Sequence, residues 1–525
     1  MREPSDPVVQ AVIVTAGAWR IPEPWRSSGG VDAGPAVHHP WRFTFIPGAH
    51  PTMRFQRTKR PPLFSAGILA AGTLVSTAAA QNAPVLPNVP QEDAYQLRAL
   101  PPQEAAQEVE AEPERYLQTE FLGDAGIKTY GWLDAGIGAN NGGAPWNGPI
   151  TFNDRNWQAQ MNQLYLVNER VVDTADGGWD LGGRIDLLYG TDYMYTTARG
   201  LDANLFSQNF GGQPSWGNRY YGLALPQMYG EVGVGDHAVK VGHFYTIIGY
   251  EVVPAIGNFF YTHAYTMQYG EPFTHTGVLD TWKATDNATV FAGITNGWDN
   301  YSDPINIFGI ANPGYPGANS NAAFLGGVSL KNDDESQALT ITTSSGNEIG
   351  SFTAPAATIG NRSILSTVYV NELSDEWTYV LQNDNGWQFG AVGVPSVLGQ
   401  QADLAQWYGI NQYLFYNISD TLVAGMRLEW FRDNNGARVI SGLRNFAFGV
   451  PNGPGNWQGG FQGNFWQATW GLNWKPTNNW IVRPEVRYDW YSPDKYGTPG
   501  TPLPFGRNFN EYGQLYGGCD AIWQF

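Results

Sequence analysis

Residues 465–491 read FWQATWGLNWKPTNNWIVRPEVRYDWY, two alternating segments joined by the short turn at residues 475–478. One face is apolar and mostly aromatic: Trp466, Trp470, Trp474, Trp480, Val486, Tyr488 and Trp490. The opposite face ends in four consecutive charges: Arg483, Glu485, Arg487 and Asp489. Alternation with period two over about ten residues is typical of a β-strand, because successive side chains point to opposite sides. An aromatic outer face and a charged inner face predict a transmembrane hairpin of a β-barrel.

The composition of the 525 residues favours a β-fold and excludes several classes of protein. There are 64 Gly, 21 Trp, 27 Tyr and 26 Phe, and only 14% of the residues are charged. This is typical of a β-fold with many turns and not of a disordered chain. The net charge of −18 argues against nucleic acid as a partner, because phosphate binding needs a basic surface. The single cysteine, Cys519, excludes an internal disulfide and a thiolate metal cluster.

Four regions follow one another along the chain. Residues 1–52 show no periodicity, and we interpret them as translated upstream sequence that is foreign to the mature protein. Residues 53–80 run from a basic start through a short apolar segment to three alanines before Gln81, the pattern of a secretory signal peptide. Residues 81–120 are rich in Pro, Gln, Ala and Glu and predict a flexible periplasmic linker. Residues 121–525 form the predicted barrel.

The barrel region contains sixteen candidate strands. They are 128–139, 158–171, 179–190, 222–233, 239–248, 273–284, 288–298, 322–331, 336–345, 362–373, 376–385, 403–416, 421–432, 465–474, 479–491 and 515–525. The connections alternate without exception between short turns, such as 235–236, and long segments, such as 249–272. Short periplasmic turns and long external loops have this rhythm. The predicted fold is therefore all-β: a transmembrane, antiparallel, up-and-down β-barrel of about sixteen strands.

The end of the chain also indicates the outer membrane. An even number of strands places both ends of the barrel on the side of the short turns. A terminal Phe525 with Trp523 two residues earlier resembles the signal that the barrel-assembly machinery recognises. We therefore predict the cell outer membrane as location, with its lipid and that machinery as partners. Pro484 lacks an N–H inside a predicted strand, which predicts a local bulge there.

Several segments resemble a known family, the OmpL-like family of β-barrel porins. The resemblance lies in KVGHFYTIIGYE (240–251), NFFY (258–261), QYGEPFTHTG (268–277), NGWD (296–299), EWFRD (429–433), Gly436 and Arg438. It extends over roughly residues 121–525. The resemblance implies an outer-membrane channel, and it supplies no established substrate or pore residues.

Sixteen strands predict an aqueous interior, because barrel diameter grows with strand number. Inward-facing ionisable groups then select the solutes that pass. The candidate pore-lining residues are Asp180, Arg184, Asp186, Glu231, Lys240, Arg427, Glu429, Arg483, Glu485 and Arg487. The alternative is that these charges pair with one another across strands and only line a wet wall.

The long connection 249–272 is the candidate constriction loop. It contains the aromatics Phe259, Phe260 and Tyr261, and it has Glu251 and Glu271 near its ends. Apolar aromatics in a long loop need burial, and the mouth or the interior of the barrel is the nearest place. An external docking or subunit contact surface would explain the same aromatics.

The sequence therefore predicts a porin for passive diffusion of small hydrophilic solutes or ions. Motifs of hydrolases, zinc proteases and phosphate-binding loops are absent from the sequence, so we expect no enzyme, no catalytic residue, no metal and no cofactor. The alternatives are an exported carbohydrate-binding β-protein and an outer-membrane barrel enzyme. The sequence leaves the oligomeric state open, including a homo-oligomer. We expect weak cation preference, set mainly by Glu251 and Glu271 where field focusing is strongest.

Overall fold

The computed structural model describes residues 117–175, 177–198, 219–301, 322–349, 359–389, 404–443, 460–493 and 502–525, all within one compact unit. Sixteen antiparallel strands form a closed barrel in which each strand pairs with its sequence neighbours and β1 pairs with β16. The strands are β1 (Lys128–Asn140), β2 (Gln160–Arg170), β3 (Trp179–Gly190), β4 (Gly222–Val234), β5 (His237–Tyr245), β6 (Thr274–Thr285), β7 (Ala288–Thr295), β8 (Ala323–Lys331), β9 (Gln337–Ile349), β10 (Ile359–Glu372), β11 (Trp377–Phe389), β12 (Leu404–Ser419), β13 (Leu422–Asp433), β14 (Gly463–Thr477), β15 (Trp480–Pro493) and β16 (Gly513–Gln524). The predicted fold class and all sixteen strands are confirmed. The predicted regions 1–52 and 53–80, and most of 81–120, lie outside the described residues.

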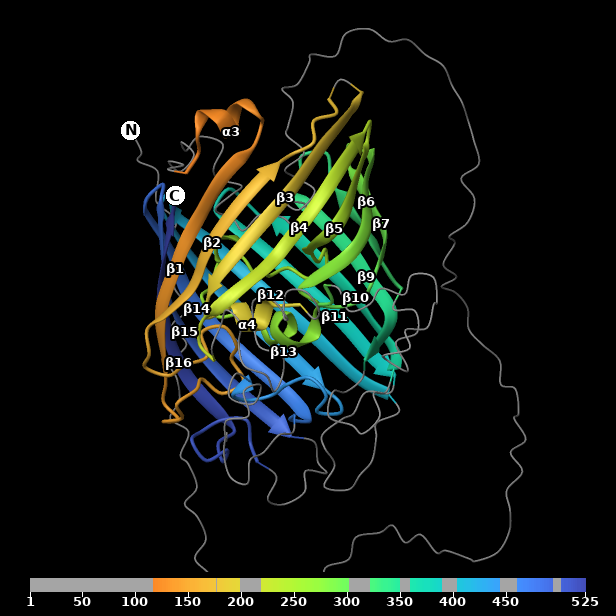
Figure 1. The fold of residues 1–525 in the computed structure, drawn as a ribbon. Coiled ribbons are helices and arrows are strands. Elements are labelled where there is room, and N and C mark those ends of the chain that lie inside the picture. The colour runs from red at the N-terminus through yellow and green to blue at the C-terminus, as the bar shows by residue number, and fades with distance from the viewer. Residues whose placement is uncertain are drawn as a thin grey trace, which may run out of the picture. The chain divides into compact units, whose positions relative to one another are not determined.

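The barrel closes through the two ends of the folded region. The N–H of Gly131 donates to the carbonyl of Phe525 at 2.8 Å, and the N–H of Phe525 donates back at 2.9 Å. The short helix α3 (Glu120–Asp124) and the C-terminus lie at the same end of the barrel (Figure 1). Both ends therefore lie on the side of the short turns, as an even strand number requires.

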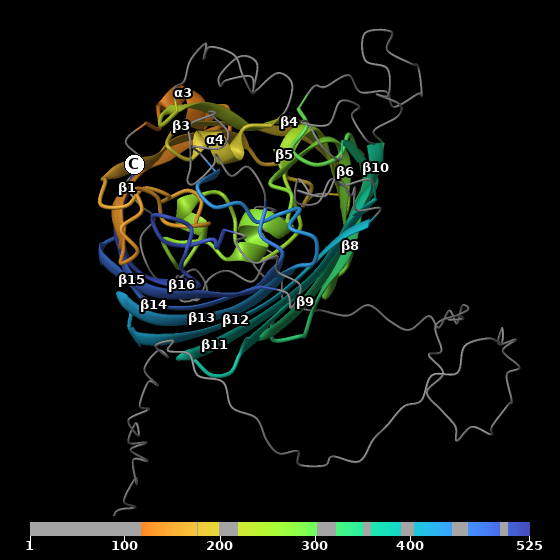
Figure 2. The ribbon, with the colours of Figure 1, turned by 90° about the horizontal axis from the view of Figure 1, so that it is seen from below.

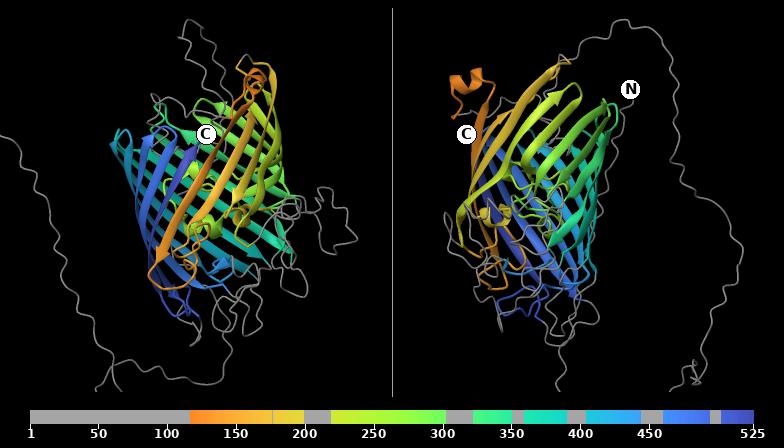
Figure 3. Two further views of the ribbon diagram at one scale, coloured as in Figure 1. Left: turned by 60° about the vertical axis from the view of Figure 1, so that its left-hand side comes forward. Right: turned by 45° about the vertical axis from the view of Figure 1, so that its right-hand side comes forward.

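The alternation of β14 and β15 has the predicted orientation. Trp470 and Val486 are each 50% exposed on the outside, whereas Arg487 and Asp489 are fully buried inside. Trp466 lies opposite Trp490, and their rings stack with centroids 5.9 Å apart. The strands are tilted as they run around the wall (Figure 3), as closure of a barrel requires.

Two local predictions are wrong. The pairing of β14 with β15 passes from Gly471–Glu485 to Trp474–Val482 without a change of register, so Pro484 does not create a bulge. The Pro484 ring points outward, and the chain accommodates it without an extra residue. β5 also ends at Tyr245 and not at residue 248, because the backbone turns away from the wall and reaches a positive φ of 85° at Gly249.

The connection from β5 to β6, residues 246–273, enters the barrel, and we call it the interior loop. Seen from the side of the long loops, its green ribbon lies inside the ring of strands (Figure 2). It contains the short turns η1 (Ala255–Gly257) and η2 (Thr266–Gly270), and η2 lies against β11 and β12. A second short helix, α4 (Tyr193–Thr196), follows β3. No helix in the described part of the chain is long and apolar enough to cross a membrane.

The aromatic residues of the interior loop form a core with the inner wall. Tyr250, Phe259 and Phe260 pack with inward side chains of β10 to β13, including Val380 and Phe415. The Phe259 ring lies 4.8 Å from the rings of both Phe260 and Phe415. Burial of this apolar surface draws the loop into the barrel, at about 25 cal/mol per Å² removed from water.

Candidate functional site

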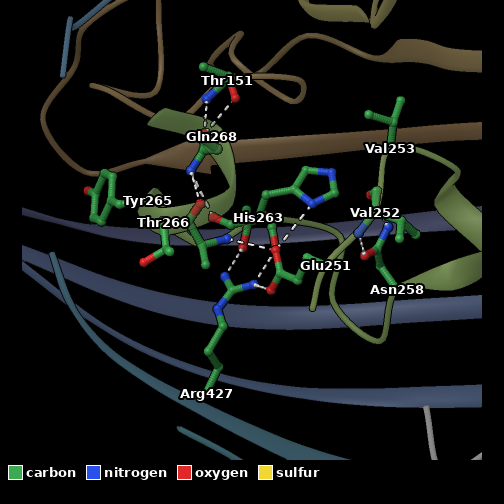
Figure 4. A network of polar contacts seen from close by, with 12 residues as sticks. Thr151, Glu251, Val252, Val253, Asn258, His263, Tyr265, Thr266, Gln268 and Arg427 are labelled. Carbon is green, nitrogen blue, oxygen red and sulfur yellow. Dashed lines mark hydrogen bonds and ion pairs between the residues drawn. The ribbon is translucent and has the colours of Figure 1, made fainter. Parts of the chain in front are cut away.

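The site is the contact between the interior loop and the charged inner wall of β13, β15 and β16. Its centre is an ion pair in which Arg427 Nη1 lies 2.5 Å from Glu251 Oε1 (Figure 4). The same guanidinium donates to the carbonyl of Thr262 at 2.7 Å. Glu251 also accepts from the N–H of Ala264 at 2.8 Å and from the hydroxyl of Tyr413 at 3.1 Å. Arg427 thus joins both limbs of the loop to the wall.

The protonation state of this centre follows from its surroundings. Burial alone would raise the pKa of Glu251, but Arg427, His263 and the Ala264 N–H lower that pKa to about 2. Burial lowers the pKa of His263, although its Nδ1 lies 3.3 Å from a Glu251 oxygen. Near neutral pH the centre therefore consists of a guanidinium, a carboxylate and a neutral imidazole.

Two further carboxylates bind the backbone of the interior loop. Glu429 accepts from the N–H of Tyr265 at 2.7 Å and from the N–H of Thr266 at 2.6 Å. Glu485 accepts from the N–H of Thr262 at 3.2 Å. Buried N–H groups of an irregular loop need acceptors. The inward carboxylates of β13 and β15 provide them.

Arg483 and Arg487 bind the carbonyl side of the same backbone. Arg483 donates to the carbonyls of Ala255 at 2.9 Å and Asn258 at 2.7 Å, and it also pairs with Asp520 of β16. Arg487 donates to the carbonyl of His263 at 2.7 Å and pairs with its own strand neighbour Asp489 at 2.8 Å. The wall thus binds donors and acceptors of the loop backbone with charges of both signs.

The far limb of the interior loop is also bound. Gln382 of β11 donates to Glu271 at 2.6 Å, and Trp407 of β12 donates to the carbonyl of Gly270 at 2.9 Å. Gln268 accepts from the N–H of Thr151, in the connection after β1, at 2.5 Å. On the side of β1 to β3, a cavity of about 10 Å³, partly lined by Tyr261, has room for one water molecule. The loop is therefore held on several sides of the barrel.

The remaining predicted site residues form a separate group on β3 to β5. Arg184 lies 2.7 Å from Asp186 and 2.9 Å from Glu169 of β2. Lys240 lies 3.8 Å from Glu231. Asp180, near the short turn after β2, pairs with Arg170 at 3.0 Å. Apart from the Arg184–Asp186 pair within β3, these charges pair across strands, which is the arrangement that the alternative interpretation of the sequence describes.

Several members of both groups are not among the candidate pore-lining residues. Asp489 and Asp520 face inward beside Arg487 and Arg483. The alternation of β15 does predict the inward position of Asp489. Glu169 lies on β2, whose register shifts where Asp134 and Ala135 of β1 pair with Gln163 and Met161. In such an irregular strand, the alternation of the sequence no longer shows which side chains face inward. In the described part of the chain, no group of three or more His, Cys, Asp or Glu side chains is placed to hold a metal ion.

A closed sixteen-stranded barrel with an apolar outer face, a charged interior and an inward loop defines an outer-membrane channel protein. The chain belongs to the family described as "Putative beta-barrel porin-2, OmpL-like", whose model matches residues 126–525. This confirms the resemblance seen in the sequence, the outer-membrane location and the channel class. No curated protein sequence matches the chain.

Solved outer-membrane channels have similar folds at low sequence identity. The outer membrane channel DcaP of Acinetobacter baumannii is 10% identical, with 79% of this chain and 100% of that chain covered and a TM-score of 0.45. The anion-selective porin from Comamonas acidovorans is 8% identical, with 76% and 99% covered and a TM-score of 0.48. OprB of Pseudomonas putida is 14% identical, with 79% and 99% covered and a TM-score of 0.46.

Proposed function

We propose that this outer-membrane channel is a porin for passive diffusion of small hydrophilic solutes or ions, with the interior loop as its constriction. The observation that carries the proposal is the fixed position of residues 249–272 inside the barrel, bound through Arg427, Glu429 and Arg483. A loop held at both limbs narrows the passage to a fixed size. Selection is then by size and by the charges that solutes meet.

The charges that solutes meet are, on this proposal, those of β3 to β5. Arg427 and Arg487 are fully buried against the interior loop, whereas the side chains of Arg184 and Glu231 are 18% and 10% exposed. Field lines concentrate in the narrow part of a low-dielectric channel. Partly exposed charges therefore affect a passing ion more than fully buried charges.

Planar-bilayer recording of the purified protein tests the proposal. We expect stepwise conductance increases that scale with salt concentration, and reversal potentials that show weak cation preference. A folded barrel that inserts into bilayers without conducting would contradict a porin. We also propose that the protein has no catalytic activity. Hydrolysis of lipid, ester or peptide probes by the purified barrel would contradict this.

The ends of the chain complete the proposal. Export through the signal at 53–80 leaves a mature protein that begins near Gln81, followed by the linker 81–120. The barrel-assembly machinery recognises the strand that ends in Phe525. The intact mass of the protein purified from envelopes tests the first point, and a mass that includes residues 1–52 would contradict it. Deletion of Phe525 tests the second, with slower assembly as the expected result.

A further inference from the structure

One part of the outer wall is polar at the depth of the membrane. On the outward side of β9 to β11, hydroxyl and amide side chains surround Leu365, which is 41% exposed. We call these polar residues the amide patch: Thr343, Ser345, Ser363, Thr367, Asn383 and Asn385. Ser363 is buried between Ser345 and Trp387 of the neighbouring strands. Ser345 lies opposite Ser363, and Thr367 lies opposite Asn383. Their sequence neighbours Ser344, Ser366, Gln382 and Asp384 are buried on the inner side. The amide patch therefore faces away from the lumen.

The depth of the amide patch follows from the aromatic residues of β11. Outward positions of this strand begin with Trp377 and Tyr379 at the short-turn end and finish with Trp387 and Phe389. Aromatic residues mark the two interfaces of a transmembrane barrel, and about 9–11 residues of a tilted strand cross between them. Two asparagines, 383 and 385, lie between the aromatic rows, within the hydrocarbon layer.

The wall of β13 to β15, farther round the barrel, shows what a lipid-facing surface of this barrel looks like. Leu428 of β13, Trp470 of β14 and Val486 of β15 are exposed at comparable positions. The Leu428 and Val486 side chains have no hydrogen-bond donor or acceptor, and Trp470 has a single donor, its indole N–H. The amide patch thus differs in chemistry, and not in depth, from the wall that faces lipid.

The hydroxyls of the amide patch are largely bonded already: Thr343 donates to the carbonyl of Ile364 at 2.7 Å, and the hydroxyls of Ser345 and Ser363 lie 2.7 Å apart. The unused hydrogen-bonding capacity lies mainly with the two amides. Asn385 donates to the Asn383 side chain at 2.8 Å, and Asn383 donates to the carbonyl of Gly409 at 3.0 Å. A primary amide has two N–H donors and an oxygen with two lone pairs. Lipid tails offer no partner for the rest, and each unsatisfied group in hydrocarbon costs several kcal/mol. A protein surface on the outside would provide partners.

We propose that the amide patch is the contact surface with a second copy of this chain, related by a two-fold axis along the membrane normal. All copies insert in the same orientation, so each presents the patch at the same depth. The patch is uncharged, and each amide or hydroxyl both donates and accepts, so the surface is complementary to itself. A self-complementary patch forms an isologous contact and hence a dimer. Its short side chains let the two walls approach closely.

Disulfide trapping in intact outer membranes tests the contact independently of channel activity. In a Cys519→Ser background, Asn385→Cys places a thiol near the two-fold axis, and Val486→Cys places one on the lipid-facing wall as the matched control. We expect several-fold more cross-linked dimer from Asn385→Cys under mild oxidation. Equal cross-linking at both positions, more at residue 486, or none at either would overturn the proposal.

A second measurement tests the energetics of the same contact. The double variant Asn383→Leu with Asn385→Leu suits lipid better and should shift the purified protein from dimer to monomer by mass in detergent. Heat-modifiable migration of the variant, equal to that of the wild type, shows that its barrel is folded. A folded double variant that stays dimeric, or a wild type that has the mass of one or three copies, would overturn the proposal.

Discussion

The inner faces of β13 and β3 carry the same arrangement of charges and use it differently. Each strand has an arginine followed two residues later by a carboxylate: Arg427 with Glu429, and Arg184 with Asp186. On β3 the arginine bonds its own strand neighbour at 2.7 Å. On β13 the arginine pairs with Glu251 of the interior loop, and Glu429 accepts from the backbone of that loop.

The difference shows that an inward charge can bind protein as readily as it can face water. The interior loop begins directly after β5 and covers β13 and β15, and the charges under it are buried. Charges on β3 to β5 lie outside this contact and pair among themselves. One wall therefore positions the interior loop, which is the proposed constriction, and the other is the proposed surface for solutes.

The largest effect that separates the two walls is on stability. Arg427→Met leaves Glu251 buried without its cation, and breaking such a pair costs about 3–5 kcal/mol. Arg184→Met should cost less, about 1–2 kcal/mol, because its side chain is partly exposed and Tyr165 and Gln227 still donate to Asp186. Urea unfolding of both variants in detergent measures the two losses. Equal losses would mean that the two walls do not differ.

The sequence predicts the strands well and the partners of the charges poorly. Alternation is a local property, so Trp470 and Arg487 could be assigned to opposite faces from their neighbours alone. The partner of Arg427 lies 176 residues earlier, in a loop without periodicity. Nothing local to β13 indicates whether a loop covers it. The loop aromatics Phe259 and Phe260 predicted burial, but the choice between the interior and an external contact needed the structure.

A smaller effect concerns the pH dependence of stability at the wall bound by the interior loop. Burial lowers the pKa of His263, so the folded state takes up its proton less readily than the unfolded state, where the pKa is near 6.5. This group therefore contributes stability above about pH 6.5, and the contribution is lost as pH falls below that value, by at most about 1.4 kcal/mol per pH unit. Glu251, with its pKa lowered to about 2, begins to weaken only below about pH 4.5.

Unfolding free energies between pH 7 and pH 5 measure this dependence. The wild type should lose stability across that interval, and His263→Gln, which stays neutral, should lose less. An equal slope in both proteins would place the titrating group elsewhere. His237, half exposed at the short-turn end with Asp280 at 2.9 Å, lies outside the interior-loop contact, so the effect of His263→Gln is compared with that of His237→Gln as a matched substitution.

The smallest effect is on ion selectivity, and it decides which wall a permeating ion meets. If β3 to β5 line the path, Glu231→Gln should shift the reversal potential in a KCl gradient toward anions by a few millivolts and leave the conductance step unchanged. Glu251→Gln with Glu271→Gln should change the conductance step as well, because it removes the carboxylates that pair with Arg427 and accept from Gln382 and so weakens the contact of the interior loop with the wall. A shift of the reversal potential in this double variant at constant conductance and constant stability would instead place both carboxylates in the path, as the sequence alone predicts.

Strong anion selectivity in the wild type would exclude either set of carboxylates as the determinant, because a negative group at the narrowest point attracts cations.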